Sequence, residues 1–225
     1  MKVKCLITTL VSVLLDTINL IAQGFVNLDF ENASLSGYTS GSVPSANAIP
    51  GWTAYIGGVA TTNVNYNVAI SGLSGVEIDI LGTNSGYAAI QGDYFMYLQG
   101  SRSQSASIGQ TGIIPLTAQT FTFYGSVFGS SVSFNGHPLS LNILGSTGNY
   151  SIYGADISAF PGQTGQLLFT SNQWPGAPGI FVDNIQFSSS PIPEPSSALL
   201  LLLGGGACIY ALKRNHRSAH ARPGR

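Results

Sequence analysis

Two acidic residues at strand spacing, Glu77 and Asp79, are of a type that could do acid–base chemistry. Alternate side chains of a β-strand point to the same face of a sheet, so the two carboxylates would lie together, as they do in a glycosidase site. The two acids of a glycosidase normally come from separate strands on either side of the sugar, whereas adjacent acids of one strand usually face solvent. We therefore interpret this pair as solvent-facing rather than catalytic.

A serine hydrolase would need a histidine base, and His137 is the only histidine between residues 24 and 190. It follows Asn135 and Gly136, a dipeptide that is typical of a tight hairpin turn, so we expect its side chain to be exposed rather than to shuttle protons. The sequence also has no Gly-x-Ser-x-Gly motif, no paired-histidine metal motif and no phosphate-binding loop. The sequence therefore predicts a protein that is not an enzyme.

Aromatic side chains offer a different chemistry, because a ring face stacks on the apolar side of a sugar while nearby amides bind its hydroxyls. We predict ligand binding for Trp174 alone, since the residues at 172–173 and 175–176 are typical of a loop. A lid packed over the edge of the sheets is an equal alternative for this residue. We expect most other aromatic residues to lie in the core. Further side chains of suitable type are Trp52, Tyr55, Tyr66, Tyr94, Tyr97, Asn63, Asn65, Gln91 and Gln99.

The chain between residues 24 and 190 has the pattern of short strands joined by turns. Several runs alternate apolar and polar residues, which is typical of half-buried strands, and no window of eleven or more residues has the period of a helix. The 28 Gly, 11 Phe and 10 Tyr fit the same class. We predict an all-β domain of about ten strands in a two-sheet, jelly-roll-like sandwich. The alternating runs are residues 25–31 and 76–80, with parts of 121–127, 139–144 and 181–187.

The charges of this predicted domain are almost all negative. Residues 24–190 contain seven acidic side chains and one basic side chain, Arg102, which gives a net charge of −6. Nucleic-acid binding needs a basic surface, so this class of function is excluded. Both cysteines, Cys5 and Cys208, fall in the terminal apolar segments, so the domain has no disulfide and depends on its core for stability.

Residues 1–22 have the layout of a secretory signal peptide. Lys2 and Lys4 precede the apolar run at 5–15, and the small residue Ala22 marks the expected cleavage site. An uncleaved anchor helix is the alternative, which Asp16 disfavours because it interrupts the apolar stretch.

The other end, residues 191–225, combines a Pro-rich start, an apolar segment at 198–212 and a basic end at 213–225. Fifteen residues rise about 22 Å as a helix, less than the roughly 30 Å of a hydrocarbon core, so we expect a marginal transmembrane helix and a temporary anchor. The positive-inside rule keeps the basic residues of both termini in the cytoplasm, which places the domain between them outside.

This C-terminal arrangement closely resembles the PEP-CTERM sorting domain of Gram-negative bacteria. The matching residues, in order, are Pro193, Glu194 and Pro195, the apolar segment, and the basic stop at Lys213 and Arg214. The resemblance implies recognition by an exosortase-type transpeptidase in the inner membrane and release near the Pro-Glu-Pro element. It also implies delivery to the outer surface or the extracellular polymer matrix. An ordinary single-pass anchor is the alternative and predicts the same topology without the cut.

A second resemblance covers short motifs of the predicted domain. Residues 27–31, the Gly51-Trp52 pair and residues 182–187 resemble the galactose-binding-like sandwiches of carbohydrate-binding modules. The resemblance implies that the first and last strands pair and that Glu31 and Asp183 hold a structural calcium ion, a hard cation that prefers oxygen ligands. The alternative, which we favour, is that both acids are solvated or cap nearby backbone amides.

These features together predict an exported, exosortase-sorted protein of the cell surface or extracellular matrix, without catalytic activity. The alternative is a secreted carbohydrate-binding module that acts on exopolysaccharide. An esterase or glycosidase would need a histidine or a cleft between paired acids that the sequence does not contain.

Overall fold

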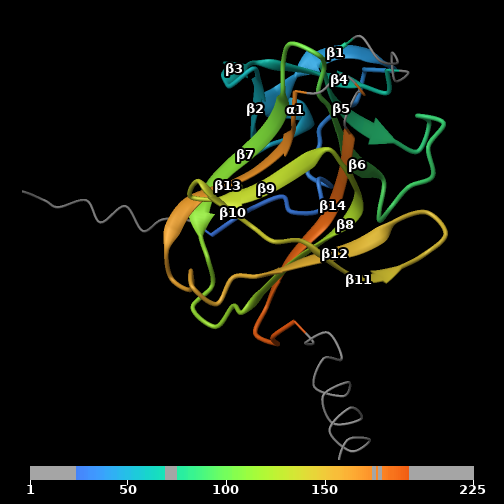
Figure 1. The fold of residues 1–225 in the computed structure, drawn as a ribbon. Coiled ribbons are helices and arrows are strands. Elements are labelled where there is room, and N and C mark those ends of the chain that lie inside the picture. The colour runs from blue at the N-terminus through green and yellow to red at the C-terminus, as the bar shows by residue number, and fades with distance from the viewer. Residues whose placement is uncertain (1–23, 69–74, 174–175, 177–178, 193–225) are drawn as a thin grey trace, which may run out of the picture.

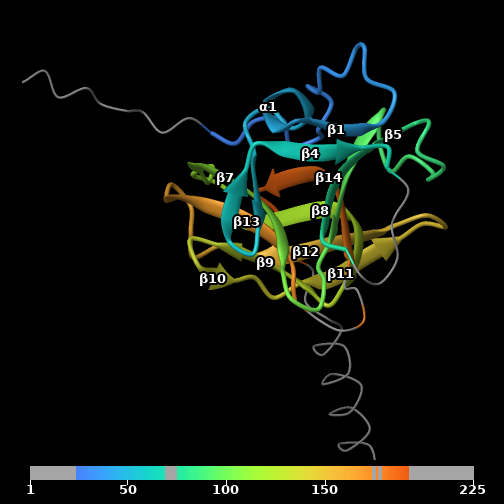
Figure 2. The ribbon, with the colours of Figure 1, turned by 90° about the horizontal axis from the view of Figure 1, so that it is seen from above.

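The computed structural model describes residues 24–68, 75–173, 176 and 179–192. These residues form two β-sheets and a single four-residue helix, α1 (Ser45–Ala48), as Figures 1 and 2 show. The all-β, two-sheet prediction is therefore confirmed. The predicted signal peptide, the sorting motif with its apolar and basic segments, and Trp174 lie outside the described residues. Within the described part of the chain, no helix is long and apolar enough to cross a membrane.

The larger sheet has eight strands, and every neighbouring pair in it is antiparallel except β4 and β5, which are parallel. Its order is β1 (Gly41–Pro44), β4 (Asn63–Tyr66), β5 (Glu77–Gly82), β6 (Tyr94–Gln99), β14 (Gly179–Ser188), β8 (Thr120–Phe128), β12 (Ser151–Asp156) and β11 (Asn142–Ser146).

The smaller sheet has six strands and is antiparallel throughout. Its order is β10 (His137–Pro138), β9 (Ser130–Phe134), β13 (Thr164–Ser171), β7 (Ala106–Ile113), β2 (Thr53–Ile56) and β3 (Val59–Thr61).

The core lies between the two sheets and is rich in aromatic rings. Alternate residues of most strands point into it, so the period-two pattern of the sequence becomes one buried face per sheet. The ring of Trp52 lies 6.1 Å from that of Phe169, and its Nε1 donates a 2.9 Å hydrogen bond to the carbonyl of Asn27. Trp52 is therefore a core residue with its one polar atom satisfied, not a binding platform.

The predicted first strand, residues 25–31, is not a strand. Asn27 and Phe30 have φ angles of 50° and 60°, which turn the chain out of the extended conformation. The side chain of Asn27 stabilises this path, because it donates to the Pro50 carbonyl and accepts from the Asn32 N–H. The segment still reaches the last strand through one bond, from the Ile185 N–H to the Leu28 carbonyl at 2.9 Å.

The predicted hairpin turn at Asn135 and Gly136 is confirmed. Both residues have positive φ angles, 49° and 79°, and they join β9 to β10 in a two-residue turn. His137 directly follows the turn and is exposed, as expected.

Two connections reach the face of the larger sheet that points away from the core. One is the β5–β6 loop, residues 83–93, and the other is the hairpin between β11 and β12. Both views place the loop and the hairpin on the same side of the molecule (Figures 1 and 2). Between them lie β6, β14 and β8, which are neighbours in the sheet.

Candidate functional site

The face of the larger sheet opposite the core carries its own apolar cluster, and we call this surface the open face. Ile80, Met96 and Val182 point into the core, whereas Leu81, Phe95, Tyr97 and Phe181 alternate with core residues on the same strands and pack on the other side. A sheet face that met only solvent would not need this second cluster, so the open face is the candidate location of a site.

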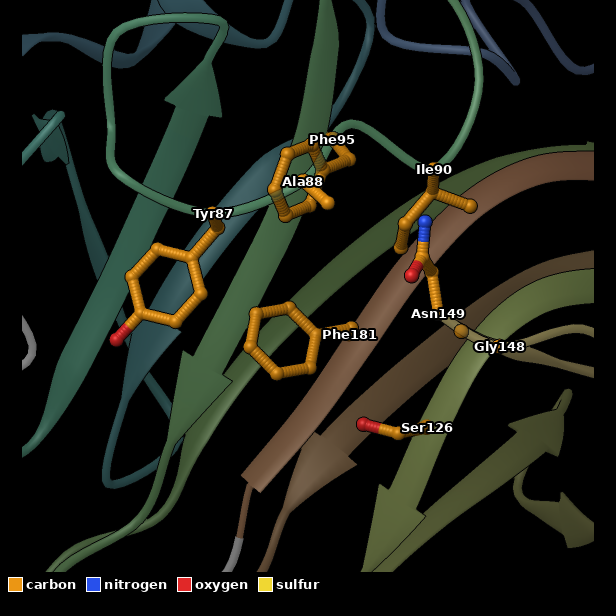
Figure 3. A pocket seen from close by; sticks show the side chains of 9 residues that line it. Tyr87, Ala88, Ile90, Phe95, Ser126, Gly148, Asn149 and Phe181 are labelled. Atoms are coloured by element: carbon orange, nitrogen blue, oxygen red, sulfur yellow. The ribbon is translucent and has the colours of Figure 1, made fainter.

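The open face contains a pocket of about 300 Å³ between the β5–β6 loop and the β11–β12 hairpin. Figure 3 shows its side chains, with the ring of Tyr87 at one end, that of Phe181 in the middle, and the Ser126 hydroxyl and Asn149 amide on the far side of Phe181 from Tyr87. None of its lining residues carries a charge. They are Tyr87, Ala88, Ile90, Phe95, Gly125, Ser126, Gly148, Asn149 and Phe181.

The aromatic wall of the pocket is built around Phe181. Its ring centroid lies 4.7 Å from that of Tyr97, 5.9 Å from that of Tyr87 and 6.0 Å from that of Phe95. Tyr97 is almost fully buried beneath this group, whereas Tyr87 keeps 39% of its surface exposed. The wall can therefore offer one supported, accessible ring to a ligand.

The pocket also has a polar side and a floor without side chains. Ser126 on β8 and Asn149 in the hairpin are both exposed, so their hydroxyl and amide groups are available to hydrogen-bond a ligand. Gly125 brings the backbone of β8 to the pocket without a side chain, and a Cβ there would collide with the carbonyl of Phe181. An apolar ring wall opposite a hydroxyl and an amide is the arrangement that binds a sugar ring and its hydroxyls.

Two acidic side chains from distant parts of the chain fix the β5–β6 loop that carries Tyr87. The N–H of Gln91 donates to Oδ2 of Asp183 at 2.8 Å, and the N–H groups of Asp93 and Tyr94 donate to Oε1 of Glu31 at 2.9 and 3.0 Å. The loop has no regular secondary structure of its own. These carboxylates therefore supply the hydrogen bonds that a sheet or helix would otherwise provide.

Asp183 is fully buried at this junction, and its protonation is strongly perturbed. Burial raises the pKa of Asp183 to about 8, and the charges of Glu31 and Asp29 raise it further, against the N–H bonds from Asn184 and Gln91 that lower it. The two predicted metal ligands, Glu31 and Asp183, thus lie close enough to interact.

The geometry of Glu31 and Asp183 matches the amide-capping alternative. Both oxygens of Asp183 accept backbone N–H groups, from Gln91 and Asn184, and Oε1 of Glu31 accepts two. No three acidic, histidine or cysteine side chains in the described ranges gather closely enough to hold a metal ion. Three of the four oxygens of these two side chains already accept backbone N–H groups, so the pair does not fit a calcium site.

The prediction that Glu77 and Asp79 face solvent is wrong. They are 5% and 0% exposed, because the open face is covered at this point rather than solvated. Oδ2 of Asp79 accepts the Val68 N–H at 3.2 Å, while its Oδ1 is buried without a partner. Burial raises the pKa of Asp79 to about 7, and the nearby charge of Glu77 adds to this. Neither acid lines the pocket.

The other aromatic residues of suitable type have structural contacts. The Tyr66 and Tyr94 rings lie 6.4 Å apart, and the Tyr55 hydroxyl accepts a bond from Gln166. Burial raises the pKa of Tyr97 to about 12, and the charge of Glu77 contributes. Tyr87 and Phe181, which form the wall, were missed in the sequence. Strict alternation would place Phe181 on the same face as the core residue Ile185, and only the register shift between Asp183 and Gln186 puts it on the open face.

No family model and no curated protein matches the chain. Among solved structures it aligns with the enzymatically active domain of tailspike protein 4 from bacteriophage CBA120, at 14% identity and a TM-score of 0.37, over 72% of this chain and 21% of that one. It also aligns with the family 11 carbohydrate-binding module from Clostridium thermocellum solved with a β-1,3-1,4-mixed-linked tetrasaccharide, at 10% identity and a TM-score of 0.33, over 68% and 98%.

A third alignment is with a β-glucosidase from Kluyveromyces marxianus, at 9% identity and a TM-score of 0.29, over 74% of this chain and 19% of that one. The chain thus spans about a fifth of the length of the tailspike domain and of the glucosidase. At these scores the alignments assign no function.

Proposed function

We propose that this protein is a non-catalytic carbohydrate-binding sandwich, of the jelly-roll kind, that is displayed outside the cytoplasm and binds a neutral glycan in the open-face pocket. The observation that carries the proposal is the pairing of an exposed, supported tyrosine ring with a hydroxyl and an amide across a pocket of about 300 Å³. Tyr87 stacks on a sugar ring, while Ser126 and Asn149 bind its hydroxyls.

The charges favour a neutral ligand over an acidic one. The pocket lining is uncharged, and the domain around it carries seven acidic side chains against one basic side chain. An anionic polysaccharide would be repelled by this field and would find no basic partner among the lining residues. A neutral glycan is not repelled by the acidic side chains and needs no basic partner.

A non-catalytic role is supported by the chemistry of the pocket lining. Hydrolysis of a glycosidic bond uses two carboxyl groups that flank the bond, and the nine lining residues include no carboxylate and no histidine. Glu77 and Asp79 lie two residues apart on one strand, are buried, and do not line the pocket. His137 lies at the β9–β10 turn of the smaller sheet.

We propose in addition that the protein is exported and sorted to the outside of the cell. The signal-like residues 1–22 direct export, and the Pro193, Glu194 and Pro195 element, with the apolar segment and the basic stop, directs sorting by an exosortase-type transpeptidase at the inner membrane. The released domain then resides at the outer surface or in the extracellular matrix, where exopolysaccharide supplies the glycan. The C-terminal resemblance is what supports this part.

A glycan array tests the binding proposal. The full chain, purified in a detergent without a sugar headgroup, is applied to neutral and acidic glycans. We expect binding to neutral glycans that weakens little with added salt, because no ion pair contributes. Binding restricted to acidic glycans, or to none, would contradict the proposal.

A further inference from the structure

The proposed site does not end at the pocket. We propose that Phe128 is a second stacking platform on the open face, so that the ligand is a glycan chain of several units rather than a single sugar. This inference rests on the proposed function, because it extends the same site along β8.

Phe128 lies on the same face of the sheet as the pocket. Along β8, Phe121 and Phe123 are buried in the core and Val127 packs against it. Ser126 and Phe128 alternate with these residues and therefore point to the open face. Two residues along an extended strand span about 7 Å, so Phe128 follows the polar side of the pocket at a distance comparable with the length of one sugar unit.

The surroundings of Phe128 explain why its ring is accessible. Directly across the ladder it pairs with Gly179, which has no side chain to cover it. On the other flank the pairing of β8 with β12 already ends where Ser151 faces Gly125, so none of the strands in the described part of the chain neighbours Phe128 on that side. Its ring is left 63% exposed, although it belongs to a regular strand.

The exposed ring of Phe128 would be more stable against the apolar face of a sugar than against water. Removing a phenylalanine ring from water is favourable, and the 63% of Phe128 that is exposed leaves most of this gain unused. A chain bound with one unit against Tyr87 and the next ones along β8 would cover the ring of Phe128. The pocket residue nearest on the same face of the strand, Ser126, is small and leaves that path free.

Calorimetry with glucose oligosaccharides of two and six units, in β-1,3, β-1,4 and α-1,4 linkage, tests the inference on the full chain. The variants are Phe128→Ala, Phe128→Trp and Tyr87→Ala. The matched control is Leu116→Ala, which truncates another exposed apolar side chain, 81% exposed and outside the pocket lining. We expect Phe128→Ala to weaken the hexasaccharide about tenfold and the disaccharide less than twofold, and Phe128→Trp to restore the hexasaccharide.

Equal effects of Phe128→Ala on both lengths, or no effect while Tyr87→Ala still abolishes binding, would overturn the second platform and leave the proposed function standing. Binding of none of these oligosaccharides, together with none on the array, would overturn both. Analytical sedimentation of the same variants tests whether the exposed ring serves self-association instead. A change from oligomer to monomer in Phe128→Ala, without a change in glycan affinity, would assign the exposed ring to self-association and overturn the inference.

Discussion

The N–H of Gln91 lies 2.8 Å from Oδ2 of Asp183, and this hydrogen bond joins the β5–β6 loop to the strand that carries Phe181. The loop contributes one ring of the pocket wall, Tyr87, and the strand contributes the other. The relative position of the two rings therefore depends on a buried carboxylate that is not itself part of the lining.

Replacing Asp183 should loosen the pocket wall before it unfolds the sandwich. Asp183→Ala removes the acceptor of Gln91, so we expect the amides of residues 83–93 to exchange hydrogen at least tenfold faster, while those of β13 stay protected. Asp183→Asn keeps one acceptor oxygen, so the exchange rate of its loop amides should lie between those of wild type and Asp183→Ala. Hydrogen exchange read by mass spectrometry measures both.

The matched control for that experiment is Asp156→Ala. Asp156 is an exposed acid that accepts the Ser158 N–H at 2.8 Å, far in sequence from the loop. Faster loop exchange in this control, or unchanged exchange in Asp183→Ala, would show that the Asp183 bond does not fix the loop.

The free energy of unfolding should fall as the pH rises from about 4 to about 8. The folded-state pKa values of Asp79 and Asp183, about 7 and 8, lie above their ordinary value of 3.8, so the folded state binds more protons than the unfolded state in this window. The stabilisation is complete below pH 4 and is lost as the pH rises through 7 and 8. Each group contributes a slope of up to about 1.4 kcal/mol per pH unit.

The same measurement on Asp79→Asn identifies the group. Asparagine mimics the protonated carboxyl, so urea unfolding of this variant at pH 5 and pH 8 should show a smaller difference than wild type. If the free energy of unfolding of Asp79→Asn depends on pH as steeply as that of wild type, Asp79 does not cause the pH dependence.

Calcium should leave the melting temperature unchanged. Because the oxygens of Asp183 and Oε1 of Glu31 already accept backbone N–H groups, we expect the same thermal unfolding in EDTA and in millimolar calcium, with magnesium as the control. A calcium-specific rise in melting temperature that disappears in Glu31→Gln would show that the two carboxylates hold the ion implied by the carbohydrate-binding-module resemblance.

Sorting at the C-terminus should depend on the Pro-Glu-Pro element. Deleting Pro193 to Pro195, or replacing Glu194 with Gln, should leave a longer species in the membrane fraction of the native host, whereas Pro191→Ala should be processed as wild type. Mass spectrometry of both termini of the mature protein measures this. Equal release of the deletion variant and wild type would contradict exosortase sorting.

The sequence predicted the strands better than it predicted the site. The alternation at residues 76–80 places β5 correctly, because Ile78 and Ile80 enter the core. Within residues 181–187 the alternation does not hold, because a register shift between Asp183 and Gln186 puts Phe181 and Ile185 on opposite faces. The same pattern misled us at residues 25–31, where the left-handed conformations of Asn27 and Phe30 break the strand. Local patterns do not reveal such a path, since the Asn27 side chain is held by Pro50, which is distant in sequence.

The pocket could not be found from local patterns for a similar reason. Tyr87 belongs to an irregular loop and Phe181 to the last strand, and the two meet only because β14 is inserted between β6 and β8 in the sheet. The burial of Glu77 and Asp79 was missed because strand spacing says which face two residues share but not what covers that face. Both errors concern contacts across the fold.

The most direct test of the account compares Tyr87→Ala with Tyr38→Ala in binding to the neutral glycan that the array selects. The two tyrosines are 39% and 38% exposed, and only Tyr87 lines the pocket, so the pair separates a pocket effect from the loss of any surface ring. Calorimetry should show about a tenfold or greater loss of affinity for Tyr87→Ala and no loss for Tyr38→Ala, with equal melting temperatures. Unchanged affinity in Tyr87→Ala would contradict glycan binding at the open-face pocket.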